Sequence, residues 1–383
     1  MSAGIYVHVP FCLTRCGYCD FNAHAGLGHL AQRYARALRA EVDLGVTSLD
    51  QTSSRFRAGE RFGSVFLGGG TPTTIDPHEL AGVLLHLREL LDVAPGAEVT
   101  TEANPDTVDE AGLESLLAGG FTRLSMGVQS FDPSVLEALE RVHTPASARR
   151  AYTAARSAGW SNVNLDLIYG ANGETLGSWR HTLEETIALG PEHVSAYALT
   201  IESATPLGRK VASGLSPAPD PDLQAEMFTL ACELLGAAGY VHYEVSNWAR
   251  PGLECRHNLV YWRREPYLGL GAGAHSFCGE RRWWNLRPPL AYLEAVESGV
   301  DPIGGHELLG ADERRLEDVS LRLRTREGIA GRELDPDAVD PLVDAGLLER
   351  LEGRVIATEA GILLLNQLVV ELTDEQALAA ADC

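Results

Sequence analysis

The sequence contains almost no lysine. Lys210 is the only one in 383 residues, so nearly all of the positive charge is carried by arginine. Basic residues are also outnumbered, because 31 Lys and Arg stand against 53 Asp and Glu and leave a formal net charge of −22. Binding to nucleic-acid phosphates needs clustered basic side chains. The charge balance therefore argues against a nucleic-acid partner.

Long apolar runs are missing as well. No stretch approaches the roughly 20 apolar residues that cross a bilayer, and no basic segment followed by an apolar one opens the chain. With 45% hydrophobic and 22% charged residues, the composition is that of a folded globular protein. We expect a cytoplasmic protein without a transmembrane segment, whose contact with any membrane protein is peripheral.

Cysteine is scarce and unevenly distributed. The chain has seven cysteines, and three of them fall within eight residues, at Cys12, Cys16 and Cys19. The other four are scattered, at Cys232, Cys255, Cys278 and Cys383. An odd number with this distribution fits a secreted disulfide framework poorly, and it favours a metal site in a reducing compartment.

Short β-rich runs alternate with helical patterns through the first half of the chain. Six runs are predicted as strands, at 5–9, 64–67, 98–102, 123–127, 163–168 and 193–199. Apolar residues at helical spacing predict a helix over 77–91, and capping residues predict another over 109–117. Repeated strand and helix units imply a parallel sheet. We therefore predict an α/β fold in which residues 1–215 form a partial (β/α)6 barrel of the TIM type.

The rhythm changes after residue 216. A helix is expected over 223–236 and a strand over 241–245, followed by an aromatic and glycine-rich stretch over 248–284. We treat 216–300 as an extension of the barrel. Residues 301–383 contain a helix near 312–324, a short β pair and a final helix from Glu359, an order that resembles a winged helix. Its helices are acidic or mixed, so packing or partner contact is favoured over DNA reading.

Polar and glycine residues recur at the predicted strand ends. Gly68–Gly70, Glu102 and Gln129 fall at or just past the carboxyl ends of three strands, and Asp166 lies inside the fifth. In α/β barrels the carboxyl ends of the strands carry the functional site. We expect these residues to share one site.

The three clustered cysteines have the spacing Cys-x3-Cys-x2-Cys on the loop after the first strand. Cysteine thiolates hold iron-sulfur clusters, and three of them leave one iron of a cubane open. The alternative is a structural zinc site with His8 or His24 as fourth ligand. Zinc ligands usually come in two separated pairs, and no second pair is present here. The spacing therefore favours a [4Fe-4S] cluster.

This cysteine spacing, with Tyr18 before the last cysteine, resembles the radical S-adenosylmethionine proteins, and Gly68-Gly-Gly-Thr71-Pro72 resembles their glycine motif. More narrowly, the strings Glu-Ala-Asn-Pro at 102, Ser-Met-Gly-Val-Gln-Ser-Phe at 125 and Asp-Leu-Ile-Tyr-Gly at 166 resemble the branch of oxygen-independent coproporphyrinogen III oxidase-like proteins. That resemblance implies S-adenosyl-L-methionine contacts at Tyr6, Tyr18, Gly69, Gly70, Thr71, Glu102, Gln129, Arg141, Asp166 and Ala198.

The implied contacts suit the ligand. S-Adenosyl-L-methionine carries an ammonium, a carboxylate and a ribose diol, so its pocket needs acids, a base and neutral hydrogen-bonding groups. Glu102 and Asp166 can accept from the ammonium or the hydroxyls, and Arg141 can pair with the carboxylate.

Two functions within this branch remain open. One is a HemW-type haem chaperone that transfers haem to an acceptor protein, and the other is an oxygen-independent coproporphyrinogen III dehydrogenase. The dehydrogenase pattern has a further cysteine where this chain has Phe21, and it has a long segment before the cluster where Cys12 here is almost at the start. Both departures favour the haem chaperone and leave enzymatic activity uncertain.

The run Cys255-Arg-His257-Asn-Leu-Val-Tyr261-Trp262 matches the His-Asn-x-x-Tyr-Trp motif of the HemW group. The resemblance implies that His257 is a haem ligand, placed beside the cluster, with Arg256, Arg263 and Arg264 available for the propionates. The alternative is an aromatic packing loop in which His257 only hydrogen-bonds.

A further glycine run, from Gly269 to Ser276, contains His275. It resembles a dinucleotide fingerprint only superficially, because no helical pattern follows it. In this family the loop closes over the cofactor side of the barrel, which makes His275 another candidate site residue.

Overall fold

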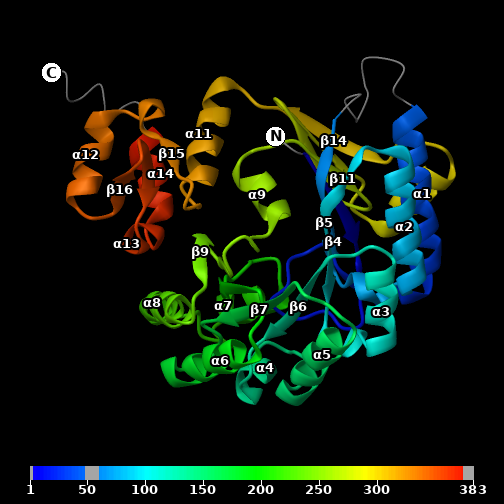
Figure 1. The fold of residues 1–383 in the computed structure, drawn as a ribbon, viewed down its shortest axis with the longest axis horizontal. Coiled ribbons are helices and arrows are strands. Elements are labelled where there is room, and N and C mark those ends of the chain that lie inside the picture. Colours follow the sequence, from blue (N-terminus) through cyan, green and yellow to red (C-terminus); the bar gives the residue numbers. More distant parts are fainter. Residues whose placement is uncertain (1–2, 48–59, 374–383) are drawn as a thin grey trace.

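The computed structural model describes residues 3–47 and 60–373. Six strand and helix units form an open, curved sheet with helices around its outside (Figure 1). The six parallel strands are β1 (Ala3–Val9), β4 (Phe62–Gly69), β5 (Val93–Ala103), β6 (Arg123–Gln129), β7 (Val163–Tyr169) and β8 (His193–Ala198). The helices after them are α1 (Ala31–Thr47), α2 (Pro77–Leu90), α3 (Glu110–Ala118), α5 (Pro145–Ser157), α6 (Leu176–Leu189) and α8 (Pro221–Ala237). The predicted partial (β/α)6 barrel is therefore present.

These elements form where the local sequence favours them. The barrel strands are almost wholly buried, as parallel strands covered on both faces should be, and β6 is buried at all seven positions. The helices begin at polar caps: the Asp76 side chain accepts from the backbone of His78 at the start of α2, and Thr175 with Ser178 forms a capping box on α6.

The main sheet extends beyond the six repeats on both sides. On one side β8 pairs antiparallel with β10 (Asn247–Ala249), which pairs with β9 (Val241–Glu244). On the other side β1 pairs parallel with β11 (Tyr267–Leu270), and three antiparallel strands follow, β12 (His275–Cys278), β13 (Arg281–Asn285) and β14 (Ile303–Leu308). The second half of the aromatic and glycine-rich stretch thus contributes three strands to the sheet, β11, β12 and β13, which the sequence did not predict.

A second, smaller unit follows the sheet. It contains α11 (Ala311–Arg322), β15 (Ile329–Ala330), α12 (Pro336–Asp344), β16 (Leu348–Leu351), β17 (Arg354–Ala357), α13 (Glu359–Ile362) and α14 (Leu365–Thr373). Its order of helix, strand, helix and hairpin agrees with the expected winged-helix-like α+β region. It has its own hydrophobic core, from Val319 to Leu372, whereas one core joins Ala3 to Val296.

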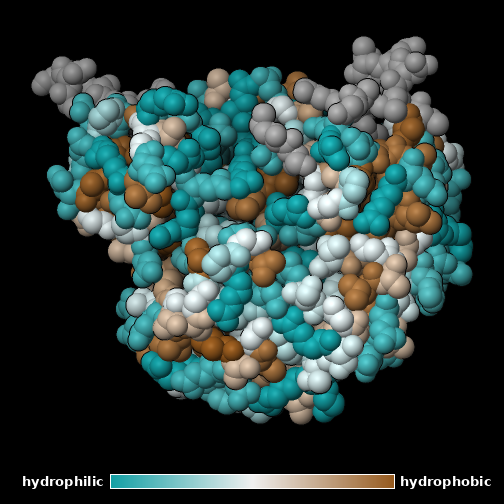
Figure 2. Space-filling model, in the orientation of Figure 1, coloured by the Kyte–Doolittle hydropathy of each residue, from teal (hydrophilic) through white to brown (hydrophobic). Residues whose placement is uncertain are grey.

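The face of the molecule drawn in Figure 2 is mainly hydrophilic, with hydrophobic residues in small separate groups. No helix of the described ranges is both long and apolar enough to cross a membrane.

Candidate functional site

The cysteine loop is closed by a short parallel pair of strands at the carboxyl end of β1. β2 (Phe11–Cys12) pairs with β3 (His24–Ala25), and residues 13–23 form the loop between them. The Gly17 carbonyl accepts from the Leu207 backbone N–H at 2.8 Å, which ties the loop to the end of the barrel. All three cysteines are free thiols with partly exposed side chains.

Two of the cysteine sulfurs receive hydrogen bonds from other parts of the barrel. The Thr71 hydroxyl donates to Cys12 Sγ at 3.6 Å, and Arg141 Nη1 donates to Cys16 Sγ at 3.4 Å. A cation and a hydroxyl beside thiols favour the thiolate form, which is the metal-binding form. These contacts act against burial, which is the larger effect and raises the pKa of the Cys12 and Cys19 thiols.

The glycine segment at the end of β4 brings the backbone close to the same place. Gly69 has a φ of +112°, and a Cβ there would lie 2.4 Å from the His8 ring. Its N–H donates to Glu102 Oε2 at 3.0 Å. Only glycine fits this conformation and this spacing, so the segment presents bare backbone next to the carboxylate.

Two carboxylates lie at the floor of the site. Burial raises the pKa of Glu102 to about 8, and the nearby charge of Asp166 adds to the shift. Burial also raises the pKa of Asp166, although Ser125 Oγ donates to it at 2.9 Å and Asn164 Nδ2 at 2.8 Å. Two acids in this arrangement repel each other when both are ionised. A cationic or hydroxyl-rich ligand would relieve that repulsion.

Arg141 and Gln129 complete the polar wall. Arg141 Nη2 donates to the Gly127 carbonyl at 3.0 Å and also to Asn104 Oδ1. Gln129 ends β6 with a φ of +64°, after an irregularity in the pairing of β6 with β7. Within the described chain, Gln129 Oε1 and Arg141 Nε are buried without a hydrogen-bond partner. Buried polar atoms normally have partners, so these two atoms fit a site that awaits a polar ligand.

These side chains line one cavity of about 340 Å³. It brings together twelve of the fourteen residues predicted from the sequence: Cys12, Cys16, Tyr18, Cys19, Gly69, Gly70, Thr71, Glu102, Gln129, Arg141, Asp166 and Ala198. We name it the cluster cavity. Sequence reasoning missed Asn104, which lines it and links Arg141 to Thr71 through a 2.9 Å bond to the threonine hydroxyl. Asn104 belongs to the string Glu-Ala-Asn-Pro at 102, of which only the glutamate was predicted to be a site residue.

Tyr6 does not line the cluster cavity. Its ring lies between two neighbouring cavities, and its hydroxyl is 3.0 Å from His8 Nδ1. Glu102 lines all three cavities, so the cavities that Tyr6 lines adjoin the cluster cavity at this carboxylate.

His257 lies elsewhere than expected. It is 1% exposed on α9 (Arg256–Trp262), and its ring nitrogens are 2.9 Å from Ser64 Oγ and from the Tyr261 hydroxyl. Ser64 stands near the amino end of β4, opposite the cysteine loop. In this conformation His257 does not line the cluster cavity, but it shares a smaller cavity of about 170 Å³ with Glu102 and Asp166, which do. Iron has no access to either ring nitrogen in this conformation, and burial lowers the pKa of the imidazole to about 3.

The three arginines near His257 are also engaged. Arg263 pairs with Glu327, and Arg264 pairs with Glu317 at 3.2 Å. Arg256 Nη2 donates to the Gly96 carbonyl at 2.8 Å. Arg263 and Arg264 link the end of α9 to the C-terminal unit, and Arg256 links the start of α9 to β5. These contacts favour the interpretation of the motif as a packing segment.

A single-metal arrangement is not found. In residues 3–47 and 60–373, no three His, Cys, Asp or Glu side chains are grouped so that they could hold one metal ion.

Comparison with known proteins supports the same reading of the fold. Residues 6–186 match the Radical SAM superfamily. The solved structure of coproporphyrinogen III oxidase (HemN) from Escherichia coli, described as a Radical SAM enzyme, matches with a TM-score of 0.80. The match covers 97% of this chain and 90% of that one at 24% identity, a level that establishes a shared fold.

Curated relatives match over nearly the full length. "Heme chaperone HemW" of Mycobacterium tuberculosis is 42% identical over 96% of this chain and 93% of its own. The proteins of the same name from Bacillus subtilis and Escherichia coli are 33% and 34% identical, and each alignment covers at least 94% of both chains. The chain therefore belongs to the HemW family of the radical SAM superfamily.

Proposed function

We propose that this protein is a HemW-type haem chaperone, which binds a [4Fe-4S] cluster and S-adenosyl-L-methionine and transfers haem to an acceptor protein. The observation that carries the proposal is the convergence of three free cysteines, a bare glycine backbone and unpartnered polar atoms on one cavity. The names of the curated relatives support the haem part of it.

Cys12, Cys16 and Cys19 would hold the cluster. When bound, such a cluster supplies single-electron chemistry and one iron with an open coordination position. The unpartnered Arg141 Nε would donate to the carboxylate of the cofactor, and the unpartnered Gln129 Oε1 would accept from one of its N–H or O–H groups. Glu102 and Asp166 would accept from its ammonium and ribose hydroxyls, and Tyr18, Gly70, Thr71 and Ala198 would line the remaining wall.

The proposal includes three segments and a cellular setting. Residues 1–215 would be the barrel with the cluster loop, 216–300 the extension with the His-Asn-x-x-Tyr-Trp motif, and 301–383 the winged-helix-like region. The protein would work in the cytoplasm, with haem and a haem-acceptor protein as partners and without nucleic acid. The acidic net charge of −22 agrees with the last point.

The competing function is the oxygen-independent coproporphyrinogen III dehydrogenase, which the likeness to HemN in fold favours. Phe21 opposes it, since its side chain is 62% exposed at the edge of the cluster cavity where that pattern has a cysteine.

One experiment separates the two functions. The protein is reconstituted anaerobically with iron and sulfide, and haemin binding and coproporphyrinogen III turnover are measured on the same preparation. We expect a cluster, haemin binding and no protoporphyrinogen. Robust protoporphyrinogen formation would replace the chaperone by the dehydrogenase, and a colourless, zinc-loaded protein would refute the cluster.

A further inference from the structure

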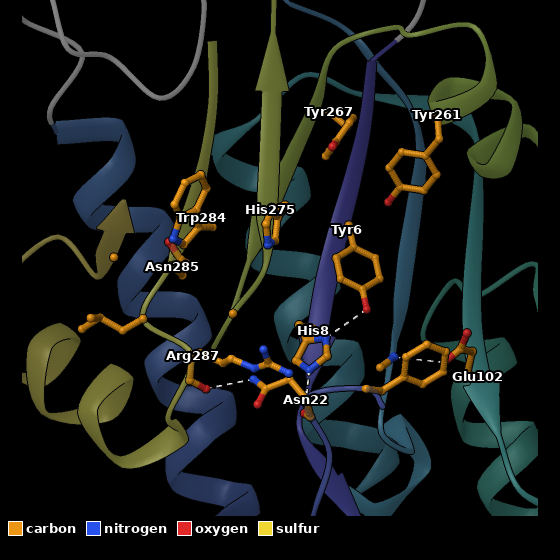
Figure 3. Close-up of a pocket in the computed structure, with 15 residues that line it drawn as sticks. Tyr6, His8, Asn22, Glu102, Tyr261, Tyr267, His275, Trp284, Asn285 and Arg287 are labelled. Atoms are coloured by element: carbon orange, nitrogen blue, oxygen red, sulfur yellow. Dashed lines mark hydrogen bonds between the residues drawn. The ribbon is translucent and has the colours of Figure 1, made fainter. Parts of the chain in front are cut away.

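A second, larger cavity adjoins the cluster cavity. Its volume is about 710 Å³, within the roughly 300–1,000 Å³ range of ligand sites. It lies over the part of the sheet that extends past the barrel, and five neighbouring strands each contribute a wall residue (Figure 3). In strand order from β1 to β14 these are Tyr6, Tyr267, His275, Trp284 and Gly304. We name it the aromatic cavity.

The lining combines apolar rings with a few polar groups. Tyr261 of α9 faces the same space as the strand aromatics, and Arg287 lies at the opposite side (Figure 3). The arginine is exposed, and its backbone carbonyl accepts from Asn22 Nδ2 of the cysteine loop at 2.9 Å. Flat aromatic walls, one cation and one accessible imidazole match a flat macrocycle that carries carboxylates and a metal.

His275 is the accessible imidazole of this cavity. Its side chain is exposed, and no side chain or backbone group in the described part of the chain hydrogen-bonds to its ring. The ring stacks on Trp284, with centroids 5.6 Å apart and planes at 28°. The ring therefore faces the cavity without a hydrogen-bond partner that would compete with a metal.

The other histidine of this cavity is already engaged. His8 Nδ1 lies 3.0 Å from the Tyr6 hydroxyl, and His8 Nε2 lies 3.0 Å from the Asn22 carbonyl. His257 is buried with both ring nitrogens in hydrogen bonds. Among the histidines considered for the metal, His275 alone combines a free ring with access to a cavity of sufficient size.

The backbone before His275 is shaped to hold it there. Gly271 has a φ of +95°, and a Cβ at this position would lie 2.5 Å from the His8 carbonyl oxygen. The turn between β11 and β12 therefore packs directly on β1, which keeps β12 against the sheet and His275 on the cavity wall.

We propose that the aromatic cavity is the haem site, with His275 as axial ligand and Arg287 as the partner of a propionate. Coordination forms one Fe–N bond from the lone pair of the neutral ring and displaces a weak ligand such as water, and no electron is transferred. Tyr267, Tyr261 and Trp284 cover the macrocycle. The inference rests on the proposed function, since it identifies where the haem of that chaperone is held.

This site would lie directly beside the cofactor. Phe21, Gly69 and Glu102 line both cavities. Phe21 supplies an exposed apolar ring at the boundary, at the position where the dehydrogenase pattern has a cysteine. The two sites would thus share a wall of these three residues, while the proposed ligands of the cluster and of the haem are different residues.

The test is an anaerobic haemin titration of the cluster-reconstituted protein, followed by absorbance and electron paramagnetic resonance. Three variants are compared: His275→Ala, His257→Ala, and His181→Ala as a matched exposed control on α6. Loss of a group that merely supports a metal ligand costs roughly 10–100-fold in affinity. We expect His275→Ala to lose at least about tenfold and to change the Soret band, with both other variants like the wild type.

A second pair of measurements keeps the proposal testable should His275→Ala fold poorly. His275→Met retains a ligand atom and should shift the Soret band while binding haemin. Arg287→Ala should weaken binding of haemin but not of its dimethyl ester, whose propionates are uncharged.

Each contrary result has a distinct meaning. A wild type that binds no haemin refutes the proposed function and this inference together. Haemin binding that is lost in His257→Ala and unchanged in His275→Ala refutes this site and leaves the chaperone function standing. Haemin binding with unchanged affinity and an unchanged Soret band in both His275→Ala and His275→Met would likewise refute His275 as the ligand.

Discussion

The two adjoining cavities of this protein differ in what lines them. The cluster cavity, of about 340 Å³, is lined by three thiols, two arginines and four carboxylates. The aromatic cavity has twice that volume and is lined mainly by tyrosine, tryptophan and histidine rings. One is built to fix a polar, charged ligand by many directed bonds, and the other to cover a large flat one. The contrast indicates that the same sheet supports two binding tasks.

The cavities also differ in how the chain assembles them. Most residues of the cluster cavity follow the carboxyl ends of consecutive barrel strands, so each comes with its own short motif. The aromatic cavity depends on the pairing of β1 with β11, two strands separated by more than 250 residues of chain. A cavity assembled from strands so far apart in the chain leaves little local pattern in the sequence.

The largest expected effect is the loss of the cluster without loss of haemin binding. In Cys16→Ala, loss of one of three thiolates should abolish the cluster, because iron-sulfur clusters depend on each thiolate ligand. Iron and sulfide content per chain, measured after reconstitution, should fall close to zero, while haemin binding is retained. Cys278→Ala, outside the loop on β12, is the control and should keep its cluster. A full cluster in Cys16→Ala would remove this residue from the ligand set.

A smaller effect is expected from Asp166→Asn. Asp166 lines the cluster cavity but not the aromatic one, and a hydrogen bond to a charged group contributes about 1.5–3 kcal/mol. The affinity for S-adenosyl-L-methionine, measured by calorimetry, should fall at least about tenfold, with haemin binding unchanged. Asp106→Asn, an exposed acid after β5, serves as control. Equal losses for both ligands would mean that the cavities act as one.

Gly69→Ala should disturb both cavities, since Gly69 lines both. A φ of +112° and a Cβ only 2.4 Å from the His8 ring impose strain of about 1–3 kcal/mol. The free energy of unfolding from urea titration should fall by that amount, and both ligands should bind more weakly. Gly96→Ala, with open space around its Cβ and no positive φ, should be near neutral. A stable Gly69→Ala protein that binds both ligands normally would contradict the close packing of Gly69 against the His8 ring.

The last expected effect is on the pH dependence of stability and concerns His257. Its pKa of about 3 lies below the roughly 6.5 of an unfolded histidine. Its contribution to stability is therefore complete above pH 6.5 and is lost as the pH falls toward 3, by at most about 1.4 kcal/mol per pH unit. The free energy of unfolding of His257→Phe should depend less on pH in that window than that of the wild type or of His181→Ala. Identical slopes would indicate that His257 is accessible to protons, and hence to iron.

Much of the barrel could be predicted from the sequence. The predicted strand at 163–168 is β7 (Val163–Tyr169), and the predicted helix at 77–91 is α2 (Pro77–Leu90). Buried parallel strands are recognisable as short apolar runs, and the cap before α2 marks its start. The grouping of the site residues followed from one rule, that strand ends meet at one edge of the sheet.

The rest could not be predicted for physical reasons. β11 and β12 have four residues each and contain or flank glycines, so no periodic pattern marks them. Their place depends on long-range pairing with β1. The position of His257 was missed because a motif gives the spacing within α9, and not the end of the barrel against which the helix packs. Tyr6 was assigned by resemblance, and the sequence does not show which of the neighbouring cavities its side chain lines.

The most direct test of two ligands in two cavities is hydrogen–deuterium exchange on the reconstituted protein, with S-adenosyl-L-methionine and haemin added separately. The account predicts that the cofactor slows exchange at residues 68–71 and 102–104, and that haemin slows it most at residues 267–287, with a smaller effect at residues 256–262, where Tyr261 lines the aromatic cavity. Protection by haemin at residues 256–262 with no change at 267–287 would contradict it.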